Sequence, residues 1–296
     1  MKKTWVFIPL LVFFLSRGVF ALELTVSGGA GNIIFGDDRL NSLGQEGLGF
    51  SSNWSPLGYI LLEGDFSPFA GFTMGFERDA LLRNRVIMNI ALRFNHIQFE
   101  VGPFMGLFNT PTRPVKAGVS ATLGLEFPGL LFGSIHGAAT LGPGFRVPGN
   151  YPGDYIQEKG SLILGFWVPY VVCSLGIHTK NFIQRRDSDL LIEDEQIRYL
   201  FRGDLFVRNV PYTIQVNLGY QELKRSYTTA GNTQRDELDS LFIGFELVYM
   251  PRSTLRFFLG GEMPVYSWGK RPLRGPDPHV PLLQVHGGFT LTLLNW

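Results

Sequence analysis

The sequence predicts an all-β chain that closes into a transmembrane, antiparallel, up-and-down β-barrel of about 14 strands, within a range of roughly 12 to 16. Three observations lead to this fold class. Strand-length segments alternate apolar and polar residues, the chain reverses at tight turns beside aromatic residues, and these turns alternate with longer, charged connections. After residue 21, no continuous apolar run approaches the about 20 residues that a membrane-spanning helix requires.

The tight turns recur at one level of the predicted sheet. Most of them contain proline, which fixes φ and cannot donate a hydrogen bond to a strand ladder, so the strand interiors stay free to pair. Aromatic residues flank the turns, as they do at the edges of a bilayer. The turns are expected at 65–69, 94–97, 127–130, 167–170, 209–212 and 250–253.

Reading the alternation between these turns gives an even number of strands, as a bacterial single-chain barrel requires. The expected strands are 22–35, 57–66, 69–78, 85–94, 97–107, 115–127, 131–141, 155–167, 171–180, 196–208, 212–223, 240–250, 254–263 and 284–296. The expected long connections are 36–55, 79–84, 108–114, 142–154, 181–195, 224–239 and 264–283.

The segment 115–127 has the clearest alternation. One face takes Val115, Ala117, Val119, Ala121, Leu123, Leu125 and Phe127, and the other takes Lys116, Gly118, Ser120, Thr122, Gly124 and Glu126. A charge on a lipid-facing position costs roughly 2–4 kcal/mol at the bilayer midplane, so the charged face is expected to look inward. A soluble, secreted β-sandwich would also alternate. The signal sequence, the connection lengths and the aromatic turns favour the membrane barrel.

The N-terminal segment 1–21 is predicted to be a cleaved Sec signal peptide, which leaves 22–296 as a single barrel domain. It begins with Lys2 and Lys3, continues with an apolar stretch, and ends with the small residue Ala21. Its removal changes the formal net charge from +1 to about −2, so bulk basicity gives no reason to expect a nucleic-acid partner. The single cysteine, Cys173, excludes a disulfide framework and is expected to face lipid as a small apolar residue.

In these features the chain resembles bacterial outer-membrane β-barrel proteins, and in strand number it is similar to a monomeric porin. The resemblance implies a bilayer environment, assembly by the barrel-assembly machinery, periplasmic termini and extracellular long loops. A terminal aromatic residue, here Trp296, is the usual assembly signal of the family. Its parity differs from that of Val285, Phe289 and Leu291, so the signal fits only if a bulge lies near Leu294.

The predicted interior carries charges of both signs, which pair across neighbouring strands and give weak ion selectivity at most. About 14 strands enclose space for water unless something fills it, and the loops 36–55 and 264–283 are the longest segments that could fold inward. The predicted pore-lining residues are Arg85, Asn89, Arg93, Glu100, Lys116, Glu126, His136, His178, Arg198, Arg202, Asp204, Gln215, Asn217, Glu246, Arg256 and Glu262.

We therefore expect a porin-like channel for passive diffusion of small hydrophilic solutes, without cofactor, bound metal or enzyme activity. A transporter of hydrophobic compounds is one alternative, because Phe104, Phe132, Phe206, Phe242 and Phe258 are expected to point inward. A surface interaction barrel is another, given the charged connections 184–195 and 224–239. A membrane-edge hydrolase is the weakest, because no family motif surrounds Ser134 and His136 or Ser174 and His178.

Overall fold

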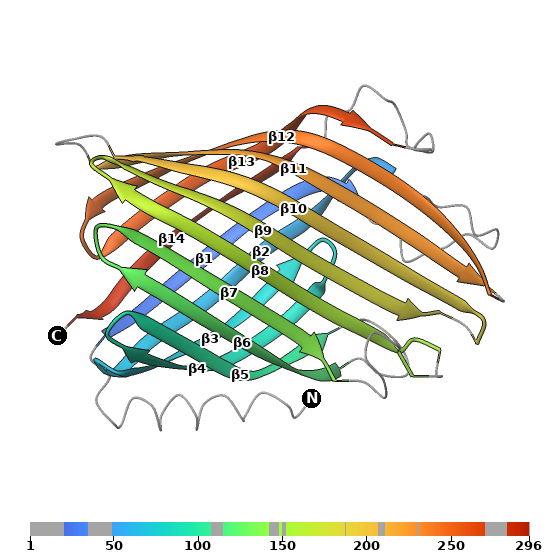
Figure 1. Ribbon diagram of the computed structural model, residues 1–296, viewed down its shortest axis with the longest axis horizontal. Helices are drawn as coiled ribbons and strands as arrows, with labels where there is room; N and C mark the ends of the chain where they lie inside the picture. Colours follow the sequence, from blue (N-terminus) through green and yellow to red (C-terminus); the bar gives the residue numbers. More distant parts are fainter. Residues whose placement is uncertain are drawn as a thin grey trace.

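The computed structural model is a closed ring of 14 antiparallel strands, each hydrogen-bonded to its neighbours in sequence, with β1 pairing to β14 (Figure 1). It describes residues 21–34, 49–107, 115–141, 148–149, 152–186, 188–206, 211–229, 231–269 and 283–295. Within these ranges, no helix is long and apolar enough to cross a membrane.

The strands match the prediction in number, and in position except at one end of the barrel, where several run longer than expected. They are β1 Ala21–Ile34, β2 Gly49–Ser67, β3 Ala70–Asp79, β4 Arg83–Phe94, β5 Ile97–Leu107, β6 Val115–Phe127, β7 Leu131–Thr140, β8 Tyr155–Val168, β9 Val171–Arg185, β10 Leu190–Phe206, β11 Tyr212–Thr229, β12 Asn232–Arg252, β13 Leu255–Trp268 and β14 Gln284–Asn295.

The predicted tight turns all lie at the end of the barrel where β1 begins and β14 ends, which we call the terminal end. Three of them need a left-handed residue to reverse the chain in so few residues. Asn95, Gly129 and Tyr170 take this role, with φ of 48°, 74° and 69°. The turn at 209–212 lies only partly within the described residues.

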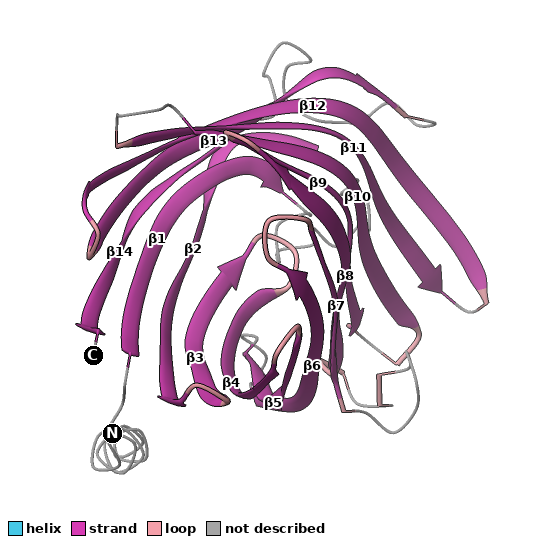
Figure 2. Ribbon diagram, turned by 60° about the vertical axis from the view of Figure 1, so that its left-hand side comes forward, coloured by secondary structure: helices cyan, strands magenta, loops and turns pink. Residues whose placement is uncertain are grey.

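At the opposite end, the far end, the prediction of long loops was wrong for several connections. The segments 181–195 and 224–239 are mostly strand, because β9 runs to Arg185, β10 begins at Leu190, and β11 and β12 extend to Thr229 and Asn232. Likewise β2 already begins at Gly49 and β13 continues to Trp268. The β11–β12 hairpin reaches beyond its neighbours (Figure 2), and in 224–239 the apolar alternation that marks a lipid-crossing strand is absent.

The burial pattern of the barrel is the reverse of that of a soluble β-protein. In β6 the apolar residues Val115, Val119 and Leu123 are exposed, and Lys116, Gly118 and Ser120 between them are buried. Leu164 and Leu175 are 61% and 65% exposed on β8 and β9, and Cys173 shares the face of Leu175. A continuous apolar outer surface of this kind needs lipid around it. The soluble sandwich is thereby excluded.

The barrel closes between its first and last strands. The β1–β14 register shifts between Leu22 and Glu23, which pair with Leu294 and Thr292, so that Leu293 is the extra residue on β14. The bulge that the parity of the last strand requires is therefore present beside Leu294. Trp296 itself lies outside the described residues.

Close packing inside the barrel depends on glycine at one position that we propose to test. A Cβ atom on Gly118 of β6 would lie 2.3 Å from Cε1 of Phe104, a buried lumen side chain of β5. Gly118→Val is therefore expected to lower the free energy of unfolding by about 1–3 kcal/mol, because the ring cannot move within filled surroundings. Urea titration of refolded protein measures this.

Gly137→Val on the adjacent strand β7 is the matched control, because a Cβ atom there meets nothing within 4 Å. Equal destabilisation by both variants would show that the close approach of Phe104 is not the cause.

Candidate functional site: a divided lumen

The interior of the barrel is crossed by a cluster of ion pairs, which we call the cross-lumen clamp (Glu77, Asp79, Lys159, Lys180). Glu77 and Asp79 lie on β3, and Lys159 and Lys180 lie directly opposite each other on β8 and β9. Lys159 Nζ is 3.1 Å from Glu77 Oε1, and Lys180 pairs with Asp79. Five strands separate β3 from β9 along the shorter arc of the ring, so these contacts bridge the lumen.

Electrostatics explains why the clamp forms. Two ammonium groups directly opposite each other on neighbouring strands repel, and within a barrel they have little water to screen them. Two carboxylates spaced two residues apart on β3 point to the same side and match this pair in number and position. Arg85, the cross-strand neighbour of Glu77 on β4, also pairs with Glu77.

The turn that follows Asp79 folds into the lumen, which the sequence did not indicate, because 79–84 was expected to be an exposed connection. Asp79 Oδ1 accepts hydrogen bonds from the backbone amides of Leu81 (2.9 Å) and Leu82 (3.0 Å). Both leucine side chains are buried. The carbonyl of Leu82 accepts a hydrogen bond from Gln157 Nε2 of β8, so the turn is fixed to the strands across from it.

A second group of buried contacts closes the same side of the lumen toward the far end. Lys116 Nζ of β6 donates to Asp154 Oδ1 (3.0 Å) and to the carbonyl of Tyr155 (2.6 Å). The Tyr155 hydroxyl reaches Gly106 of β5 (2.8 Å). Burial raises the pKa of Asp154, but the bonds from Lys116 and from the Gly149 amide outweigh it and hold that pKa below its ordinary value. This side is thus filled with side chains.

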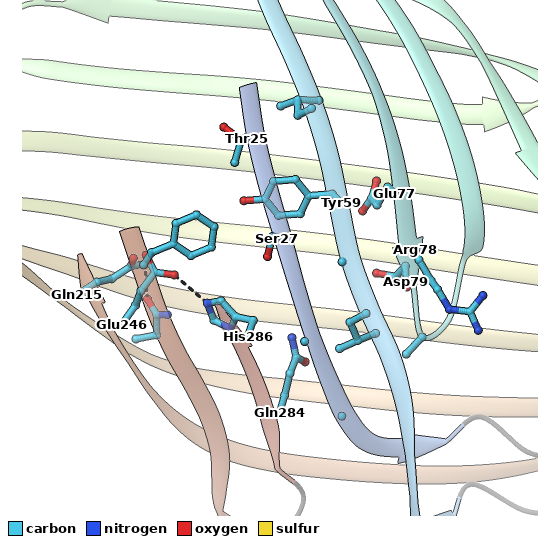
Figure 3. A pocket seen from close by; sticks show the side chains of 18 of the residues that line it. Thr25, Ser27, Tyr59, Glu77, Arg78, Asp79, Gln215, Glu246, Gln284 and His286 are labelled. Atoms are coloured by element: carbon cyan, nitrogen blue, oxygen red, sulfur yellow. Dashed lines mark hydrogen bonds and ion pairs between the residues drawn. The ribbon is translucent and has the colours of Figure 1, made fainter. Parts of the chain in front are cut away.

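The other side of the lumen holds a cavity of about 580 Å³. Its wall comes from β1 to β3 and β9 to β14, and Glu77, Asp79 and Lys180 of the clamp form one border. Figure 3 shows the Tyr59 side chain lying over β1 beside Ser27, with Glu77 on the next strand. Hydroxyl, amide and charged groups make up most of this wall, together with the apolar residues Leu57, Leu61, Leu81, Leu200 and Phe258.

A row of hydrogen-bonding side chains crosses four strands of the cavity wall. His286 Nε2 is 2.8 Å from Glu246 Oε2 (Figure 3). With the Gln215 amide oriented to satisfy both neighbours, its nitrogen donates to Glu246 Oε1 (3.0 Å) and its oxygen accepts from Arg202 Nε (2.8 Å). His286 and Glu246 lie on β14 and β12, and they meet because the intervening residue of β13 is Gly260, opposite both.

The structure divides the predicted pore-lining residues between the two sides. Arg85, Asn89 and Lys116 are buried in the filled side. Arg93 pairs with Asp65 near the terminal end, where Glu126 also lies. Arg198, Arg202, Gln215, Asn217, Glu246 and Arg256 line the cavity. Glu100, His136, His178, Asp204 and Glu262 lie on lumen-facing positions but do not line that cavity, although Glu262 pairs with Arg198 (2.6 Å) and Asp204 with Arg202 (2.9 Å), both of which do.

The predicted pore lining omits Glu23, Tyr59 and His286, which border the cavity, whereas Glu63 and Glu77 lie on faces that the alternation placed inward, and the structure confirms this. Their inward position follows from strand parity, so the signal was available. Glu23 and Glu63 are cross-strand neighbours on β1 and β2. The lysine pair opposite Glu77 and Asp79 could not be found in this way, because it depends on which strands face each other in the closed ring.

The residues of the alternative functions do not gather into a site within the described ranges. Phe104, Phe242 and Phe258 are buried, Phe132 packs on Trp167 with ring centroids 4.7 Å apart, and Phe206 is exposed at the terminal end. His136 Nδ1 is 2.9 Å from Thr122 Oγ1 on the adjacent strand. No three His, Cys, Asp or Glu side chains of these ranges come together as a metal site would need.

A closed antiparallel ring with an apolar exterior and a polar interior is the architecture of outer-membrane proteins. The chain has an outer-membrane β-barrel fold. An outer-membrane channel from Pseudomonas putida F1 resembles it at 8% identity and a TM-score of 0.48, covering 93% of this chain and 96% of that one. OmpT of Vibrio cholerae, expressed in the outer membrane, resembles it at 9% identity and a TM-score of 0.47, covering 92% of this chain and 96% of that one.

An anion-selective porin from Comamonas acidovorans gives 10% identity, a TM-score of 0.42, and coverage of 93% of this chain and 99% of that one. At such identities the likeness concerns the fold alone. No protein-family model matches the sequence, and no curated protein does.

Proposed function

We propose that the barrel is a passive channel for small hydrophilic solutes in the bacterial outer membrane. The observation that carries this proposal is the polar-walled cavity of about 580 Å³ inside the ring. A polar interior bounded by a lipid-facing wall offers water and hydrated solutes a route that the bilayer denies them. Diffusion along such a route needs no cofactor.

The charges around the cavity favour weak ion selectivity. Arg198, Arg202 and His286 each pair with a carboxylate of the described barrel, as Lys180 does in the clamp. Opposite charges held within hydrogen-bonding distance largely cancel at the scale of a hydrated ion. Glu23 and Glu63 lie side by side, and the cation Arg256 lines the same cavity.

Reconstitution into planar bilayers tests the proposal. We expect discrete, long-lived conductance steps that grow in proportion to salt concentration, with a reversal potential close to zero in a salt gradient. Vesicles carrying the protein should also swell in isotonic arabinose. Folded protein, identified by its altered gel migration before boiling, that gives neither steps nor swelling would contradict a channel.

We further propose that the terminal end faces the periplasm and the far end faces outward, because outer-membrane barrels place short turns inside and longer connections outside. A protease site inserted between Thr229 and Asn232, at the tip of the β11–β12 hairpin, should be cut in intact cells. A site inserted at Asn95 should be cut only after the outer membrane is opened. The reverse pattern would contradict this orientation.

A second candidate function is supported by the same hairpin. β12 is 21 residues long and β11 is 18, whereas about 9–11 suffice to cross a bilayer, so both project well past it. Such a projection offers a surface for contact with other molecules. Shortening the hairpin by four residues on each strand should leave conductance unchanged if the channel is the function of the barrel.

A further inference from the structure

We infer that the cross-lumen clamp sets the size limit of the channel, by confining passage to the cavity beside it. The inference rests on the proposed channel function. Glu77, Asp79, Lys159 and Lys180 would then be the residues that determine which solutes pass.

The clamp lies at the boundary between the two sides of the lumen. It joins β3 to β8 and β9, which are far apart in the ring, and so divides the lumen between them. The side enclosed by β3 to β9 is filled with buried side chains, including Phe104 and Gln157. The side enclosed by β1, β2 and β10 to β14 holds the open cavity. The clamp is the boundary between the two.

Polar contacts of the turn after Asp79 hold this boundary in place. The Leu81–Leu82 turn lies between the two sides, because Leu81 borders the cavity and Leu82 bonds to Gln157 of the filled side. Its backbone amides donate to the Asp79 carboxylate, which also pairs with Lys180. Apolar side chains contribute to holding the turn, but its attachment to the opposite wall is polar, through Asp79 to Lys180 and from Gln157 to the Leu82 carbonyl. Removing the two carboxylate charges would leave Lys159 and Lys180 repelling each other at this wall.

Loss of the clamp should widen the route for solutes. With the charges removed, the turn loses its ionic attachment and the lysine chains move apart, so the cavity gains space at the expense of the filled side. Neutral solutes detect such a widening without responding to the change in charge. The permeation rate of larger sugars should therefore rise more than that of small ones.

The experiment uses Glu77→Gln/Asp79→Asn, which keeps side-chain size, in full-length protein reconstituted in vesicles. Swelling rates are compared for arabinose, sucrose and raffinose. We expect the rate for raffinose relative to arabinose to rise about threefold or more over wild type. The matched control, Glu23→Gln/Glu63→Gln, removes two carboxylates from the same cavity without touching the clamp, and its ratio should equal that of wild type.

An unchanged ratio in the clamp variant, or an equal rise in the control, would overturn the inference. Lys180→Gln, a milder variant that breaks one pair, gives the same test if the double variant does not fold, and its ratio should rise as well. Folding is scored by heat-dependent gel migration in each case.

A second measurement separates this inference from the channel function. Leu82→Cys in a Cys173→Ser background places a thiol at a fully buried position. With the clamp intact, a water-soluble maleimide should label it slowly, and with Glu77→Gln/Asp79→Asn about tenfold faster. Faster labelling without any conductance in wild type would contradict the channel while supporting the clamp. Equal labelling would contradict the clamp.

Discussion

Replacing Lys116 with methionine is expected to lower the free energy of unfolding by about 3–5 kcal/mol, the largest effect of any single substitution considered for this barrel. The Lys116 and Asp154 side chains are only 7% and 0% exposed, so Asp154 would be left buried without its cation. The carbonyl of Tyr155 would lose its donor as well. Equilibrium urea titration of refolded protein, followed by tryptophan fluorescence, measures the loss.

Lys224→Met is the matched control. Lys224 Nζ is 2.7 Å from Glu222 on the projecting part of β11, where both side chains are partly open to solvent. An ion pair of this kind contributes about 0–1 kcal/mol. Similar losses in the two variants would show that burial of the Lys116–Asp154 pair is not what makes it important.

The same pair gives a pH dependence with a definite sign. Because the pKa of Asp154 is lowered in the folded protein, its contribution to stability is present above its ordinary value of 3.8 and is lost as the pH falls through the folded pKa. In Lys116→Met the uncompensated carboxylate is a penalty that protonation relieves. The stability difference between wild type and variant should therefore shrink as the pH falls toward about 4 and below.

Replacing Leu164 with arginine is expected to cost about 2–4 kcal/mol, because the guanidinium would enter the hydrocarbon region. Leu164 lies in β8 four residues before Val168, is 61% exposed and faces outward beside Leu175. Refolding into lipid vesicles under urea measures the cost.

Tyr59→Arg serves as control, since Tyr59 is 38% exposed on the lumen side of β2 and borders the cavity. The control should lose much less stability than Leu164→Arg. A larger loss at Tyr59 than at Leu164 would mean that the inner and outer faces have been assigned the wrong way round.

The strands at the terminal end could be predicted almost to the residue, because two local signals coincide there. In β5 and β6, for example, the apolar alternation stops where a tight turn and an aromatic residue begin, as at Phe127 and Pro128. At the far end the strands leave the lipid. β12 begins at Asn232 instead of 240, because the residues there pair with β11 through the backbone ladder although they lack the apolar alternation of a lipid-crossing strand.

The interior could be predicted only as a list of inward positions. Parity placed Lys116 and Arg85 inside, but it could not distinguish a buried ion pair from a group exposed to water in a cavity. That distinction depends on contacts such as Lys180 to Asp79, which are 101 residues apart and lie on strands that do not pair. No pattern along one strand carries this information.

Because β1 pairs with β14, the ring cannot close until the last strand of the chain has been synthesised. Any chain that stops before Gln284 leaves the edges of β1 and β13 without partners, and unpaired strand edges in hydrocarbon are too costly to persist. Insertion and closure must therefore follow completion of the whole polypeptide. Deletion of the last strand should therefore prevent formation of the folded barrel. Loss of the same number of residues from a far-end hairpin should only shorten that hairpin.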